Sequence, residues 1–77
     1  MNNRIKVSVN ANFDMFGNLT PAVIIFETGK AYEINKVLDQ RRAVSLKAGG
    51  SGIRYTCKIN GKLIYLYYDD NLWYLER

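Results

Sequence analysis

The sequence predicts an all-β protein, an antiparallel meander of five to six strands that curls into a small barrel on the scale of SH3-like and OB-like folds. Arg4–Phe13 alternates between apolar and polar residues over its whole length, as a half-buried strand does. Asn60-Gly61, a dipeptide favoured in two-residue hairpin turns, separates two runs rich in β-branched and aromatic residues. Residues 22–36 resemble another hairpin, apolar on both faces, and barrel closure would cover the second face and hide the sheet edges.

The first strand, Arg4–Phe13, should turn one row of apolar side chains inward. That row is Ile5, Val7, Val9, Ala11 and Phe13. Residues 14–18 follow as a loop, with Gly17 or Asn18 at a positive φ. Met15 and Phe16 lie at its tip, where they either fold back to plug an open end of the core or stay exposed as an anchor for a partner.

The second hairpin is expected to pair residues 22–27 with residues 30–36 through a tight turn at Thr28-Gly29. The expected pairs are Val23 with Ile34 and Ile25 with Tyr32. Ile24 and Phe26 then lie on the other face, where either barrel closure covers them or they form a contact surface.

The segment from Gln40 to Lys47 fits two conformations. Asp39 suits a helix N-cap, and we expect a short helix or helical turn here, although about two turns gain little stability alone. A short strand is the alternative. Residues 48–52, Ala-Gly-Gly-Ser-Gly, should form a flexible loop before the next strand.

The last third of the chain is the most informative and predicts three consecutive antiparallel strands with turns at Asn60-Gly61 and Asp70-Asn71. The expected pairs are Ile59 with Lys62, Cys57 with Ile64, Tyr55 with Leu66, Tyr68 with Trp73, and Leu66 with Leu75. One face should form the core, with Ile53, Tyr55, Cys57, Ile59, Ile64, Leu66, Tyr68, Trp73 and Leu75. The other face carries Arg54, Thr56, Lys58, Leu63, Tyr65, Tyr67, Tyr74 and Glu76. A register slip of one residue would bury Arg54 and Lys58 without partners.

Length and composition indicate a single domain over residues 1–77. No apolar run approaches the ~20 residues of a membrane span, so we expect a cytoplasmic protein without a membrane partner. Cys57, the single cysteine, falls on the predicted core face and should be a small buried hydrophobe rather than a reactive thiol.

The sequence lacks the residues that most enzymes use for catalysis. It contains no histidine, which removes the commonest general base and the commonest transition-metal ligand. Residues 49–52 lack the spacing of a phosphate-binding loop, and Asp69-Asp70 is typical of an exposed turn. We therefore expect no enzyme activity, no cofactor and no metal.

Charge gives the strongest functional indication. The net charge is +4, and residues 40–62 contain six basic side chains and no acidic one. A tyrosine-bearing strand face with lysine and arginine resembles the surfaces that stack bases and meet phosphates, so we expect a nucleic-acid-binding module. The expected binding residues are Arg41, Arg42, Lys47, Arg54, Lys58, Lys62, Tyr65, Tyr67 and Tyr74. A purely structural explanation also exists, in which Arg54 stacks on Tyr67 across the strands.

The alternative function is protein interaction, either with a partner protein or as a homodimer. Its contact residues would be Met15, Phe16, Ile24 and Phe26, or an unpaired edge strand such as Arg4–Phe13. Binding through such apolar surfaces should survive salt, whereas nucleic-acid binding should weaken steeply with it.

Overall fold

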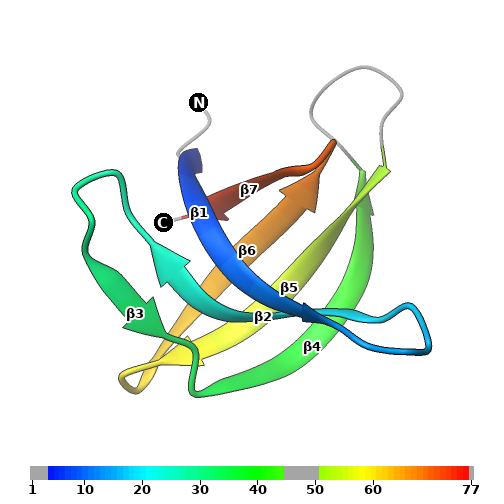
Figure 1. The fold of residues 1–77 in the computed structure, drawn as a ribbon, viewed down its shortest axis with the longest axis horizontal. Coiled ribbons are helices and arrows are strands. Elements are labelled where there is room, and N and C mark those ends of the chain that lie inside the picture. The colour runs from blue at the N-terminus through cyan, green and yellow to red at the C-terminus, as the bar shows by residue number, and fades with distance from the viewer. Residues whose placement is uncertain (1–3, 45–50, 77) are drawn as a thin grey trace.

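The computed structural model describes residues 4–44 and 51–76, which form one antiparallel sheet curled into a half-barrel (Figure 1). Its strands are β1 (Arg4–Phe13), β2 (Leu19–Ile25), β3 (Ala31–Glu33), β4 (Lys36–Val44), β5 (Ser51–Ile59), β6 (Lys62–Asp69) and β7 (Leu72–Glu76). Their order across the sheet is β3-β2-β1-β7-β6-β5-β4. The predicted all-β class and curled antiparallel sheet are confirmed, and the described residues contain no helix. The sheet is a half-barrel, and the pairing of β1 with β7 departs from a simple meander.

The seven strands among the described residues exceed the five to six expected, because one bent segment counts as two strands. Only Ile34 and Asn35 separate β3 from β4. The Ile34 N–H donates to the Ala22 carbonyl on β2, and the Asn35 N–H donates to the Lys58 carbonyl on β5. The chain therefore changes partner within two residues, which brings the two edges of the curled sheet together.

The last three strands have the predicted register. Ile59 pairs with Lys62, and Tyr68 pairs with Trp73. Both turns place non-glycine residues at positive φ, with Asn60 at 51° in the first turn and Asp70 and Asn71 at 52° and 63° in the second. These are the backbone conformations that two-residue hairpin turns require, and Asn and Asp tolerate them better than most residues.

Strand β1 follows its predicted alternation only in its first half. Val7 is buried, and Ile5 and Val9 pack against the core. An irregularity between Asn10 and Ala11 shifts the pairing with β2. Ala11 and Phe13 are exposed beyond it, so their predicted inward orientation is wrong.

The β2–β3 hairpin is shifted by one residue from the prediction. Phe26 and Lys30 flank a three-residue loop, in which Gly29 has a φ of 91°. A loop one residue longer than expected shifts β2 by one residue against β3. Because side chains alternate with period two, Ile24 and Phe26 then face the core together with Tyr32. Ile24 accordingly pairs with Tyr32 and is only 1% exposed. Phe26 also turns inward and meets the Tyr32 ring edge-on at 5.5 Å between centroids.

The predicted short helix is wrong, because its described part belongs to strand β4. Pairing with β5 satisfies backbone groups that a two-turn helix would leave unpaired at its ends. A bulge at Leu38 breaks the alternation of side chains along β4. Val37 before it packs against the core, and Asp39 after it pairs with Thr56 on the outward side of β5. Residues 45–50, which include Lys47 and most of the expected loop, lie outside the described residues.

Gly52 was expected in the loop but belongs to β5. A Cβ atom at this position would lie 2.8 Å from the Tyr68 carbonyl oxygen, closer than real Cβ contacts allow. Glycine therefore permits β5 to approach β6 closely here.

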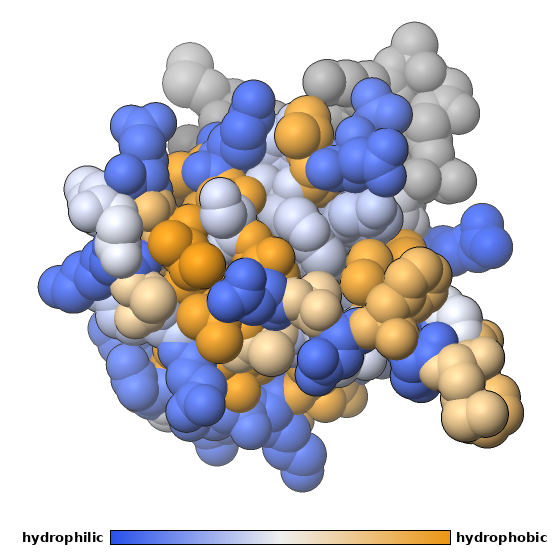
Figure 2. Space-filling view, viewed as in Figure 1, coloured by the Kyte–Doolittle hydropathy of each residue, from blue (hydrophilic) through white to orange (hydrophobic). Residues whose placement is uncertain are grey.

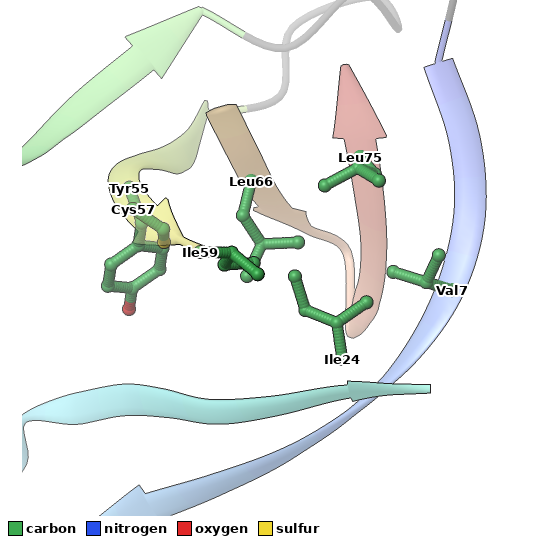
Figure 3. Close-up of a cluster of buried hydrophobic side chains, with 7 residues drawn as sticks. All are labelled: Val7, Ile24, Tyr55, Cys57, Ile59, Leu66 and Leu75. Atoms are coloured by element: carbon green, nitrogen blue, oxygen red, sulfur yellow. The ribbon is translucent and has the colours of Figure 1, made fainter. Parts of the chain in front are cut away.

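The core fills the concave side of the sheet (Figure 3). Its buried members are Val7, Ile24, Tyr55, Cys57, Ile59, Leu66 and Leu75. Cys57 is a free, fully buried cysteine, as predicted, and burial raises the pKa of its thiol to about 11. A thiol with so high a pKa stays protonated near neutral pH and is a poor nucleophile.

Candidate nucleic-acid interface

The convex side of the sheet presents side chains in rows that cross β4, β5, β6, β7 and β1. Directly paired residues on neighbouring strands share a face and lie about 5 Å apart. One row, here called the arginine–tyrosine row, consists of Arg41, Arg54, Tyr67, Tyr74 and Lys6. At a strand spacing of ~4.8 Å it spans roughly 19 Å.

Two further rows run beside it. The second consists of Asp39, Thr56, Tyr65, Glu76 and Arg4, and the third of Lys36, Lys58 and Leu63. The three rows together are called the outer face below. Among the described residues they carry six basic side chains and two carboxylates, and no carboxylate belongs to the arginine–tyrosine row. A third carboxylate, Asp69, lies on the same side of the sheet in the next row, where it pairs with Leu72. The outer face is therefore cationic on balance.

Tyr67 is fixed in the middle of this face. The Arg4 guanidinium lies 3.8 Å from the centre of its ring, and its hydroxyl donates to Glu76 Oε1 at 2.8 Å. Burial, helped by the neighbouring Glu76 carboxylate, raises the pKa of Tyr67. One ring face is thus already covered by an arginine, which limits what else can stack there.

Arg54 pairs with Tyr67 as expected but stacks elsewhere. Its guanidinium lies 5.2 Å from the centre of the Tyr65 ring, on the adjoining row. Tyr65 is 41% exposed, whereas Tyr67 and Tyr74 are half-buried, so Tyr65 is the ring most open to a ligand. The predicted Arg54–Tyr67 stack is replaced by two arginine–tyrosine stacks.

The arginines of this face differ in how accessible their N–H groups are to a ligand. The Nε atoms of Arg4 and Arg54 are buried and have no hydrogen-bond partner among the described residues. Arg41 is exposed, and its Nε donates to Asp39 Oδ2 at 2.7 Å. A guanidinium has five N–H donors, so a single contact to one carboxylate oxygen does not exhaust Arg41.

Two of the expected binding residues belong to other surfaces. Arg42 pairs with Ile53, which places it on the concave side of β4, at an exposed position. Lys62 pairs with the buried Ile59 and lies at the exposed end of the β5–β6 hairpin. The structure thus brings together Arg41, Arg54, Lys58, Tyr65, Tyr67 and Tyr74 from the expected set.

Sequence reasoning missed Arg4, Lys6 and Lys36 as members of this surface. Arg4 and Lys6 join it because β1 pairs with β7, a contact between the two ends of the chain that leaves no local signal. Lys36 joins it because β4 is a strand that pairs with β5.

The described residues show no arrangement that would hold a metal. Nowhere in residues 4–44 and 51–76 do three or more His, Cys, Asp or Glu side chains gather as ligands would. The same part of the chain has no helix long and apolar enough to cross a bilayer. What the outer face offers chemically is fixed positive charge beside aromatic rings.

Comparison with protein-family models, curated proteins and solved structures gives no significant match.

Proposed function

We propose that this protein is a non-enzymatic module that binds single-stranded nucleic acid on its outer face. The observation that carries the proposal is the arginine–tyrosine row, in which two tyrosines lie between two arginines and a lysine with no carboxylate among them. Phosphates need the cations and unpaired bases need flat, apolar partners, and this row supplies both within about 19 Å.

Each kind of side chain has a distinct role in the proposal. Tyr65 offers the most open ring, and base stacking on an aromatic side chain contributes about 1–3 kcal/mol per base. Arg41, Lys6 and Lys58 meet the phosphates, since all three are exposed on this face. Stacking tolerates every base, so we expect weak sequence preference and strong salt dependence.

The two carboxylates of the outer face do not cancel its attraction for phosphate. Asp39 is paired with Arg41, and Glu76 accepts a hydrogen bond from Tyr67 and lies directly across from Arg4. A base stacked on Tyr65 would reach the row that holds these carboxylates, but both already have hydrogen-bond partners in Arg41 and Tyr67.

An amide chemical-shift titration tests the proposal. Isotope-labelled protein is titrated with a short single-stranded oligonucleotide and with a duplex at about 50 and 200 mM salt. We expect salt-sensitive shifts on β4 near Arg41, on β5, β6 and β7, and at the start of β1, larger with the single strand. Absence of shifts at the lower salt, or shifts confined to the concave side, would overturn the proposal.

Protein interaction is the second candidate function. The observation that favours it is the exposure of Met15 and Phe16. Of the two alternatives for these residues, plugging the core is wrong. Ile24 and Phe26, the other residues expected to act as contacts, turn into the core side instead.

A further inference from the structure

The β1–β2 hairpin ends in an exposed apolar cluster. Phe13, Met15 and Phe16 are 74%, 89% and 80% exposed, and apolar side chains project at this end of the molecule in Figure 2. These three residues are called the apolar tip below. Single exposed apolar residues are ordinary on protein surfaces, but three large ones within four residues at one hairpin end typically mark a contact site.

The apolar tip is held in shape by one aspartate. The Asp14 carboxylate accepts hydrogen bonds from the backbone N–H groups of Phe16 and Asn18, both at 2.9 Å, and from the Asn18 side chain at 3.1 Å. The hydrogen bond from the Asn18 N–H is the main cause of the lowered pKa of Asp14, which therefore stays ionised near neutral pH. A preformed loop loses little conformational entropy when it binds.

The opposite end of the half-barrel contains an open apolar groove. It encloses about 940 Å³ and is called the end groove below. Its apolar lining includes Ile24, Phe26, Tyr32, Ile59, Leu63 and Ile64. Leu63 belongs to the third row of the outer face and lies 61% exposed where that face meets the groove. Figure 2 shows apolar side chains gathered, with polar ones around them, on the left of the view. The groove is large enough for aromatic side chains from outside.

The charges around the two features are complementary. Lys6, Lys30 and Lys62 line the end groove, against two carboxylates, Glu27 and Glu76. The apolar tip carries the single carboxylate of Asp14 among its large apolar side chains. Its insertion would place a negative charge beside a groove edge that is positive on balance.

We propose that the apolar tip of one copy of this protein inserts into the end groove of a second copy. The tip cannot reach its own groove, because β2 runs between them and its seven residues span roughly 23 Å. Figure 1 shows the β1–β2 turn and the β2–β3 turn at opposite ends of the molecule. The contact is therefore head-to-tail, and it builds rings or open chains rather than a closed symmetric dimer.

The contact is small. Three tip side chains bury less than the ~1,200 Å² that separates weak encounters from stable complexes. We therefore expect reversible, concentration-dependent association that persists at high salt, because apolar burial dominates it. This proposal does not depend on nucleic-acid binding, since the tip lies off the outer face and, of the groove lining, Lys6, Leu63 and Glu76 alone belong to that face.

Sedimentation velocity over a wide concentration range tests this contact. The tip variant is the double substitution Met15→Ser and Phe16→Ser, and the groove variant is Leu63→Glu. Leu38→Glu is the matched control, the same change at another exposed leucine, on β4. We expect the wild type and the control to associate alike, and both test variants to associate about tenfold more weakly, with thermal melting confirming that each is folded.

Mixing the two variants gives the decisive result. The tip variant retains an intact groove and the groove variant retains an intact tip, so an equimolar mixture should form dimers and nothing larger. A wild type that stays monomeric at millimolar concentration would overturn the proposal. So would a groove variant that associates as well as the wild type, because that result indicates tip-to-tip contact, or a mixture that does not associate.

Discussion

The Tyr55 hydroxyl on β5 donates a hydrogen bond to the Leu19 carbonyl on β2. These strands lie second from the two opposite edges of the sheet, so the bond spans the interior of the half-barrel. Tyr55 is fully buried, and its ring also packs near Trp73 at 5.8 Å between centroids. Together with Asn35, which accepts from the Asn60 N–H at 2.7 Å, this bond holds the curled sheet together across its open side.

Replacing Tyr55 with phenylalanine tests the contribution of this bond. We expect the free energy of unfolding to fall by about 1–2 kcal/mol, because the Leu19 carbonyl loses its partner in a partly buried setting. Urea denaturation measures the change. Tyr65→Phe, at the exposed ring of the outer face, is the control and should change stability by less than about 0.5 kcal/mol. Equal effects of the two substitutions would show that the cross-barrel bond adds nothing.

Ile24 and Ile25 test the corrected register of the β2–β3 hairpin. Ile24 is fully buried and Ile25 is half-buried. Ile24→Ala should therefore cost about 2–5 kcal/mol of stability, and Ile25→Ala distinctly less. Chemical denaturation of both variants measures the difference. A larger loss of stability from Ile25→Ala than from Ile24→Ala would contradict the observed register and favour the one expected from a two-residue turn.

Cys57 gives a prediction about pH. Burial raises the pKa of its thiol from the usual 9.0 to about 11, so the folded protein keeps a proton that the unfolded chain loses between these values. Stability from the neutral buried thiol is fully present below pH 9 and is lost as the pH rises toward 11. Wild-type stability should thus fall more steeply than that of Cys57→Ala over this window, as measured by urea denaturation at pH 8.5, 9.5 and 10.5.

The pKa of Tyr55 is also raised. Because Tyr55 is present in both proteins, its contribution cancels when the wild type is compared with Cys57→Ala. Parallel stability curves for the two proteins would contradict the assignment. As a second readout, a thiol reagent should label native Cys57 slowly and unfolded Cys57 rapidly.

Local chemistry explains which parts of the fold the sequence predicts correctly. The register of the last three strands was predictable because Asn60-Gly61 and Asp70-Asn71 each specify a two-residue turn. The β2–β3 turn was mispredicted because Gly29 closes a three-residue loop, and the sequence contains no clear sign of the extra residue.

The same distinction applies to the candidate interface. Alternation along β5, β6 and β7 sufficed to group Arg54 with Tyr65, Tyr67 and Tyr74. Whether Arg41 or Arg42 faces outward depends on the bulge at Leu38, and no residue type in the sequence indicates that bulge. Long-range pairing, rather than any local signal, adds the basic residues at the start of β1.

Arg41 and Arg42 allow the most direct test of nucleic-acid binding. They are adjacent, equally charged and both exposed, but pairing with Arg54 places Arg41 on the outer face and pairing with Ile53 places Arg42 on the concave side. The measurement is the affinity of Arg41→Ala and Arg42→Ala for a labelled single strand, by fluorescence anisotropy at several salt concentrations.

We expect Arg41→Ala to weaken binding several-fold and to reduce the salt slope by about 0.7, the loss of one phosphate contact on a single strand. Arg42→Ala should bind like the wild type. Equal losses from the two substitutions would mean that net charge alone attracts the strand, and no loss from Arg41→Ala would remove the arginine–tyrosine row as the binding surface.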